Sequence, residues 1–313
     1  MGSKPEPKHE PKPAAMLTPA QMAQTAEDVA YAKATGRPLK SFLLGLTAGG
    51  YIALGFVFFI ISQVGAEDLP WGLARIIGGV VFATGLALVV LTGAELFTAS
   101  TLTLTARASG RITWGQLLRN WGVVYVANFI GALTIVALIY LSGTWRSADG
   151  GWGAVVLNTS LGKVSHPFFE AFFLGVLCNL MVCLAIWAAY SGRTTTDKVL
   201  AVTMPIALFV AAGFEHSVAN MFMIPLGLLI KATAGSAFWD EAGLAHSDFA
   251  DLTWDAFFLD NLLPVTLGNI VGGGVMIGIL YWTIFHHIEG SKKNKKKQRP
   301  ERGGKGFASG AGT

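Results

Sequence analysis

Charged side chains are scarce in this sequence, and cysteine is scarcer still. Only 13% of the 313 residues are Asp, Glu, Lys or Arg, and 52% are hydrophobic, whereas about a quarter of a soluble domain is charged. This balance excludes an ordinary soluble domain and is typical of a chain that crosses a membrane several times. The two cysteines, Cys178 and Cys183, lie in one apolar segment, so they form neither a disulfide framework nor a zinc motif.

Several motifs that would indicate an enzyme or a nucleic-acid binder are also missing. The sequence contains no metal-ligand cluster, no cofactor fingerprint and no nucleophile–base motif, so we expect no enzyme activity, no metal and no cofactor. A basic stretch, KKNKKKQR, begins at residue 292. It directly follows a predicted membrane span, so we interpret it as an orientation signal that touches anionic lipid and not as a nucleic-acid patch.

Six apolar segments are long enough to cross a bilayer, which takes about 20 residues of helix. The second and fifth are too long for one simple helix and contain polar and small residues, so we predict that both are interrupted. The predicted spans are Phe42–Ile61, Leu73–Ala106, Leu117–Leu141, Phe168–Tyr190, Val199–Leu229 and Phe257–Phe285.

Lysine and arginine fall mostly on one predicted side of the membrane. Nineteen of the 23 basic residues precede the first span, follow the sixth, or lie in the 2–3 and 4–5 connections. The bias predicts that both termini are cytoplasmic. We therefore divide the chain into a cytoplasmic extension (1–40), a six-span pore domain (41–287) and a basic, disordered cytoplasmic tail (288–313). Thr18 and Pro19 predict a short helix in the extension, which either covers the pore mouth, binds a cytoplasmic partner or is a plain linker.

Three pairs of segments look alike and occur in the same order in the two halves of the chain. Residues 42–46 (FLLGL) resemble residues 172–176 (FFLGV), and residues 93–95 (GAE) resemble residues 213–215 (GFE). Because each half has an odd number of spans, the second half enters the membrane from the opposite side, which predicts an inverted 3+3 repeat with its site near the midplane. The third pair matches Asn120, Val124, Asn128 and Gly131 with Asn261, Val265, Asn269 and Gly272.

Ionisable residues stand at both predicted interruptions, GAELFTAS (93–100) and GFEHS (213–217). Glu95 and Glu215 recur symmetrically. A carboxylate at a broken helix can accept free backbone N–H groups, so we predict that both glutamates, with Gly93 and Gly213, are structural. His216 is different, because an ionisable group inside a membrane is costly and typically faces a cavity. We predict that His216 faces a pore.

Four motifs resemble signatures of the formate–nitrite transporter family: GAELFT (93–98), CNLMVCLAIW (178–187), GFEHSVANMFMIP (213–225) and VTLGNIVGGG (265–274). The MFMIP and NLLPVTLGN stretches look more like the formate-channel branch than the nitrite branch. The resemblance implies an all-α, aquaporin-like protomer in the bacterial inner membrane, assembled as a homopentamer with one pore in each protomer. The Asn-Pro-Ala triplet of aquaporins themselves is absent.

The resemblance also implies roles for individual residues. By matching position, His216 resembles the central pore histidine, Thr98 its hydrogen-bond partner, and Lys163 a basic residue that draws anions into the outer vestibule. Asn179 and Asn269 resemble polar residues that line the pore. Two constrictions are implied as well, made on the cytoplasmic side by Leu86, Leu96 and Val182, and on the periplasmic side by Phe82 and Phe209.

The function implied by this resemblance is a proton-linked channel or transporter for formate or a related small anion, or its acid, embedded in membrane lipids. Nitrite, hydrosulfide and lactate or acetate remain alternative substrates, and a non-transporting membrane sensor or scaffold remains an alternative outside the family's function. His216 either gives a proton to formate or carries a charge that meets the anion. The sequence leaves both versions open.

Overall fold

The computed structural model describes residues 16–288, and all regular secondary structure in that range is helical. The α-helices are α1 (Pro19–Thr35), α2 (Pro38–Gln63), α3 (Trp71–Thr92), α4 (Phe97–Ser100), α5 (Leu104–Ala108), α6 (Trp114–Leu141), α7 (Gly151–Val164), α8 (Phe168–Ser191), α9 (Thr195–Ala212), α10 (Ser217–Thr233), α11 (Ser236–Ala242), α12 (Leu263–Asn269) and α13 (Leu280–Trp282). Short 3-10 turns η1 (Ala66–Asp68), η2 (Thr101–Thr103), η3 (Thr144–Arg146) and η4 (His246–Phe249) join them, and π-helical segments η5 (Ala256–Leu262), η6 (Ile270–Ile279) and η7 (Thr283–Ile288) alternate with α12 and α13.

Six helical stretches within residues 16–288 are long and apolar enough to cross a membrane. They are α2, α3, α6, α8, α9 and the continuous stretch Ala256–His286. Four of the six predicted spans, the first, third, fourth and sixth, therefore begin and end within a few residues of a helical stretch. The second and fifth share only their first part with α3 and α9. The sixth span winds partly as a π-helix, which the sequence pattern did not indicate.

The second and fifth predicted spans each contain a helix end. In the second, α3 ends at Thr92 and the next helical residues begin with Phe97; in the fifth, α9 ends at Ala212 and α10 begins at Ser217. Because α3 and α9 are each long enough to span by themselves, the interruption of a membrane span at these points stays a prediction.

Glycine allows the closest helix contacts in both halves, and Gly131 and Gly272 do so at matching places. A Cβ on Gly49 or Gly131 would overlap the facing backbone of α6 or α2, and a Cβ on Gly268 or Gly272 would overlap the backbone of α8. Small residues allow this close approach, and van der Waals contact between backbones is a main source of helix association in a membrane. The α2–α6 pair and the α8–α12/η6 pair therefore both depend on glycine for their close contact.

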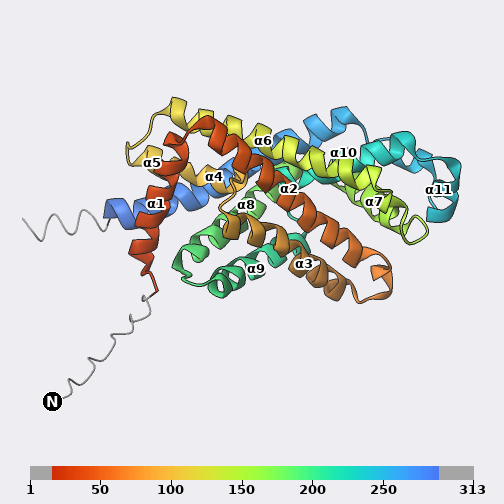
Figure 1. Cartoon of the computed structure of the whole chain (residues 1–313), viewed down its shortest axis with the longest axis horizontal. Helices are drawn as coiled ribbons and strands as arrows, with labels where there is room; N and C mark the ends of the chain where they lie inside the picture. The colour runs from red at the N-terminus through yellow and green to blue at the C-terminus, as the bar shows by residue number, and fades with distance from the viewer. Residues whose placement is uncertain (1–15, 289–313) are drawn as a thin grey trace, which may run out of the picture.

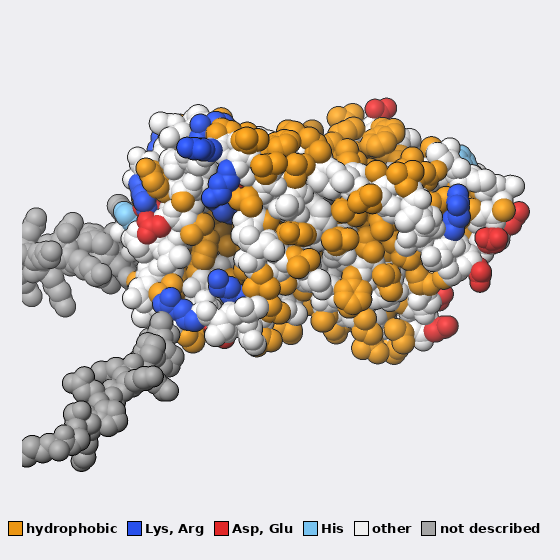
Figure 2. All heavy atoms as spheres, viewed as in Figure 1, with side chains coloured by type: hydrophobic (Ala, Val, Ile, Leu, Met, Phe, Trp, Pro, Cys, Tyr) orange, Lys and Arg blue, Asp and Glu red, His pale blue; other side chains and the backbone are white. Residues whose placement is uncertain are grey.

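The bundle has two chemically different ends. Figure 1 shows α1 and α5 at one end and α7 and α11 at the other. In Figure 2, Lys and Arg side chains gather mostly at the end with α1 and α5, Asp and Glu mostly at the end with α11, and apolar side chains cover the body between them. This separation of charge matches the bias in basic residues along the sequence.

Helix α1 begins where its residues predict, with Thr18 and Gln21 forming a capping box. Arg111, in the turn after α5, ties it down: its Nη1 lies 2.7 Å from Asp28 and 3.2 Å from Glu27. These hydrogen bonds, that to Asp28 most of all, raise the pKa of Arg111. Arg119 of α6 adds a hydrogen bond to the carbonyl oxygen of Ala34, so α1 is bound to the body of the protein at both its middle and its end.

Candidate functional site

Two matching backbone turns form the centre of the protein. Gly93 and Gly213 both adopt the left-handed conformation, with φ of 73° and 79°, and end α3 and α9. The chain then runs extended through Leu96 or His216 before the next helix starts. The N–H of Glu95 donates to the carbonyl oxygen of Leu44, and the N–H of Glu215 donates to the carbonyl oxygen of Leu174. The first turn is therefore bound to α2 and the second to α8.

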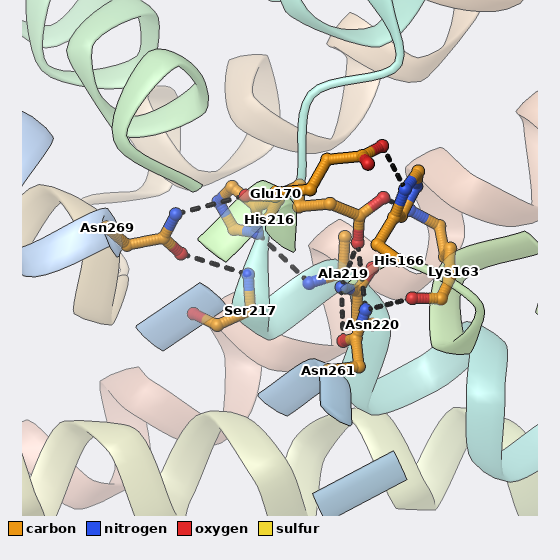
Figure 3. A network of polar contacts seen from close by, with 10 residues as sticks. Lys163, His166, Glu170, His216, Ser217, Ala219, Asn220, Asn261 and Asn269 are labelled. Carbon is orange, nitrogen blue, oxygen red and sulfur yellow. Dashed lines mark hydrogen bonds and ion pairs between the residues drawn. The ribbon is translucent and has the colours of Figure 1, made fainter. Parts of the chain in front are cut away.

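A buried asparagine holds each turn from the side. Asn128 donates to the carbonyl oxygens of Gly45 (2.8 Å) and Glu95 (2.9 Å) and accepts the N–H of Phe97 (2.8 Å). Asn269 makes the same three bonds in the other half: it donates to the carbonyl oxygens of Gly175 (2.8 Å) and Glu215 (3.0 Å) and accepts the N–H of Ser217 (3.0 Å). Figure 3 shows Asn269 with its side chain directed at Ser217. These asparagines and glycines belong to the segments that the sequence pairs as a repeat.

The two glutamates do not bind the free backbone N–H groups, which corrects the mechanism expected from the sequence. The asparagines accept those groups, and the carboxylates bind side chains instead. Glu95 accepts hydrogen bonds from Ser41 (3.1 Å) and Asn120 (3.4 Å).

Glu215 has more hydrogen-bond partners than Glu95. It accepts hydrogen bonds from Lys163 (2.8 Å), Asn220 (2.6 Å) and Asn261 (3.1 Å), the network drawn in Figure 3. Both carboxylates are buried, at 6% and 2% exposure for Glu95 and Glu215, and a buried carboxylate is tolerated only with such partners.

The repeat extends to α1 and α7, which the sequence comparison missed. Asn120 donates to the carbonyl oxygen of Lys33 near the end of α1, and Asn261 donates to that of Lys163 near the end of α7. Lys33 is therefore the counterpart of Lys163. Burial lowers the pKa of Lys33, and the nearby carboxylate of Glu95 opposes that shift. The spacing of 130 residues, the same as between Gly45 and Gly175, is the signal that could have identified this pair.

His216 sits at the N-cap of α10, almost fully buried. Its Nδ1 accepts the N–H of Ala219 at 3.0 Å, and its Nε2 lies 3.1 Å from Oγ1 of Thr98. Because Nδ1 accepts a proton donor, the network assigns the neutral tautomer with its proton on Nε2. His216 therefore presents one N–H toward Thr98, on α4. A proton added to Nδ1 would face the N–H of Ala219, so the hydrogen bond that caps the start of α10 would be lost.

A cavity of about 530 Å³ ends on this histidine. Phe82 and Phe209 lie beside His216 at its inner end, with the Phe209 ring 5.9 Å from the imidazole and nearly parallel to it, and 5.8 Å from Phe82, edge to face. Lys163 of α7, Glu170 of α8 and His166 in the turn between these helices also line the cavity. The lining thus combines charged side chains that are partly exposed with two aromatic rings and an imidazole that are buried.

The remaining residues that the resemblance singles out lie elsewhere in the core. Leu86, Leu96 and Val182 are buried in the same apolar cluster as Phe82 and Phe209, but they do not line the cavity. Their role as a second constriction stays a prediction.

Asn179 and Asn269 do not line the cavity either. Asn179 donates to the carbonyl oxygens of Thr98 (3.1 Å) and Asn269 (2.6 Å) and to the hydroxyl of Thr101 (3.1 Å). It therefore braces α4, the helix that presents Thr98 to His216. A substrate-path role for both asparagines stays a prediction. No cluster of three or more His, Cys, Asp or Glu able to hold a metal ion occurs within residues 16–288.

A bundle of six apolar spans with a cavity that ends on a histidine at a helix break is the architecture of a membrane channel or transporter. The chain belongs to the formate/nitrite transporter family, whose model matches residues 20–283. Its relatives in that family are channels or transporters and not enzymes.

Named relatives lie close to this chain. It is 51% identical over 270 residues to the formate channel FocA of Escherichia coli K12, covering 86% of this chain and 95% of FocA, and 51% identical over 263 residues to FocA of Haemophilus influenzae, covering 84% and 93%. Among solved structures it is similar to a pentameric formate channel with formate bound, with a TM-score of 0.76 and 46% identity over 79% of this chain and 97% of that one.

Proposed function

We propose that this protein is a proton-linked channel or transporter for formate, working as a homopentamer in the bacterial inner membrane with one pore in each protomer. The substrate and the assembly are drawn from the relatives, which are named as formate channels and include a pentamer solved with formate bound. The observation that carries the mechanism is the cavity that ends on His216, with its Nε2 held beside Thr98.

The physical problem is the cost of moving a small anion past apolar rings. A bare carboxylate loses many kcal/mol of hydration in an apolar constriction. Protonating it is cheaper: with a carboxyl pKa near 4, neutralisation at pH 7 costs about 4 kcal/mol, at roughly 1.4 kcal/mol per pH unit. Phe82 and Phe209 at the inner end of the cavity would exclude hydrated ions, so a route that brings proton and formate together is favoured over a bare-anion route.

His216 is the group we assign to this coupling. In its neutral form it offers an N–H on Nε2, which a carboxylate can accept in place of Thr98. Complete transfer of that proton requires Nδ1 to gain one, since a neutral imidazole that simply lost Nε2–H would become an anion. Gaining a proton at Nδ1 breaks the hydrogen bond with Ala219. The proposal therefore links each proton that passes to a brief loosening of the first turn of α10.

The orientation follows from charge. We propose that the end with α1 and α5 faces the cytoplasm, as the excess of Lys and Arg there favours, with both termini on that side. The cavity lined by Lys163 then opens to the periplasm. Leu86, Leu96 and Val182 would form the cytoplasmic-side constriction, with Asn179 and Asn269 beside the path, and α1 would lie near the cytoplasmic mouth.

A substrate panel tests the proposal most simply. The protein is reconstituted into liposomes, and uptake of formate, nitrite, hydrosulfide and lactate is measured with and without a pH gradient. We expect formate uptake that increases when the outside is more acidic. If another of the four is taken up preferentially, that compound replaces formate as the proposed substrate. If none of the four shows protein-dependent flux, the result favours a sensor or scaffold.

A further inference from the structure

The charges that line the cavity are mostly paired. Nζ of Lys163 lies 2.8 Å from Oε1 of Glu215, and both side chains are largely buried, at 14% and 3% exposure. Nδ1 of His166 lies 2.7 Å from Oε1 of Glu170 at a more exposed position. A lysine this close to a carboxylate has its field largely cancelled at longer range. Lys163 is therefore poorly suited to attract an anion by itself.

Arg75, in the first turns of α3, is the cation of the cavity lining without such a partner. It lines the cavity, and within residues 16–288 no carboxylate lies within ion-pair distance of it. Its one hydrogen bond there runs from Nε to the carbonyl oxygen of Ala211, 2.8 Å away at the end of α9. Within residues 16–288, neither terminal nitrogen of the guanidinium makes a hydrogen bond.

The guanidinium is also held in place. The ring of Trp71 lies 5.7 Å from its central carbon, and a Cβ on Gly213 would come within 2.7 Å of Nη2. Arg75 is thus packed over the turn that leads, three residues later, to His216. Because Nε is fixed by Ala211, the planar fork loses little further freedom when it binds a ligand.

We propose that Arg75 is the residue that docks the anion in this cavity, through two parallel N–H···O bonds to a small carboxylate. A planar fork of N–H donors matches the two oxygens of a carboxylate, and such charge-assisted pairs are stronger than neutral hydrogen bonds. Lys163 instead fixes Glu215 and the turn before His216. This assignment rests on the proposed function, because it concerns the first step of the same path.

The test is formate uptake as a function of concentration in liposomes, for wild type, Arg75→Gln and Arg75→Lys. Arg146→Gln is the matched control, since Arg146 also stacks on a tryptophan, Trp145, but does not line the cavity. We expect Arg75→Gln to raise the half-saturating concentration about fivefold, the effect of one unit charge about 4 Å away at the dielectric constant of water, with maximal flux preserved. Arg75→Lys keeps the charge, so its half-saturating concentration should lie between those of wild type and Arg75→Gln. The half-saturating concentration of Arg146→Gln should match that of wild type.

A merely structural Arg75, tying α3 to α9, would lower maximal flux and thermal stability and leave the half-saturating concentration unchanged; that result overturns the proposal. A second readout, independent of flux, is the rise in melting temperature that formate causes by binding the folded state. We expect Arg75→Gln to lose it. If the wild type carries no formate but still shows a stabilisation that Arg75→Gln loses, the function is wrong and the docking site stands. An equal stabilisation in both proteins contradicts the docking site.

Discussion

Replacing Asn269 by leucine tests the asparagine that holds the turn before α10. Leucine is close to asparagine in shape, so it fills the same space and leaves no room for a water molecule. The substitution leaves the N–H of Ser217 and the carbonyl oxygen of Glu215 without a hydrogen-bond partner in a fully buried region. The carbonyl oxygen of Gly175 is not left unpaired, because it lies within α8 and also accepts a hydrogen bond of that helix. Each buried group left unpaired costs about 1–3 kcal/mol, so two cost about 2–6 kcal/mol.

That loss is large against a typical total stability of about 5–15 kcal/mol. We expect an oligomer that is poorly recovered, or that melts about 5–20 °C lower in detergent. Asn128→Leu should behave alike, because Asn128 makes the matching three bonds. Asn158→Leu is the control: Asn158 is exposed on the cavity wall and should change stability by less than about 0.5 kcal/mol. Wild-type yield and melting temperature for Asn269→Leu would refute the reasoning.

Three further predictions concern assembly, orientation and the first glutamate. Mass measurement in detergent should give a pentamer, and a stable monomer or tetramer would exclude it. A cysteine placed at Ser147 should react with an impermeant reagent added outside, and a cysteine placed at Thr196 should react only from the cytoplasm. The background reaction should be low because Cys178 and Cys183 are buried, and the reverse pattern contradicts the orientation. Glu95→Gln should lower expression or assembly, since Glu95 binds Ser41 and Asn120 across two helices, and a well-assembled variant that selectively loses proton coupling would move the proton role to Glu95.

The spans and the repeat could be predicted because both are written in local patterns. Runs of apolar residues mark the six spans, and the glycine, glutamate and asparagine that pair in the sequence also pair in space: Asn128 with Gly45 and Glu95, and Asn269 with Gly175 and Glu215. A backbone turn buried in an apolar body needs hydrogen-bond partners for its polar groups. The polar side chains that supply them stand out in an otherwise apolar sequence.

Partners chosen across the fold could not be predicted in the same way. The carboxylate of Glu215 binds Lys163, 52 residues away, and Arg75 binds Ala211, 136 residues away. Nothing in a local pattern says which charge a buried lysine meets, so the sequence indicates only that Lys163 attracts anions and assigns no separate role to Arg75. The π-helical winding of η5 and η6 likewise has no counterpart in the apolar periodicity of the sequence.

The central claim, that His216 couples formate to a proton, is tested by His216→Asn. Asparagine is a good N-cap residue, so it can accept the N–H of Ala219 and keep the start of α10, but it cannot titrate. Paired proton and formate fluxes are measured in liposomes for wild type and variant. We predict that uptake of formate driven by a pH gradient is lost in His216→Asn, while passive anion current persists or grows. Proton-linked uptake at the wild-type rate and stoichiometry in His216→Asn would contradict the account.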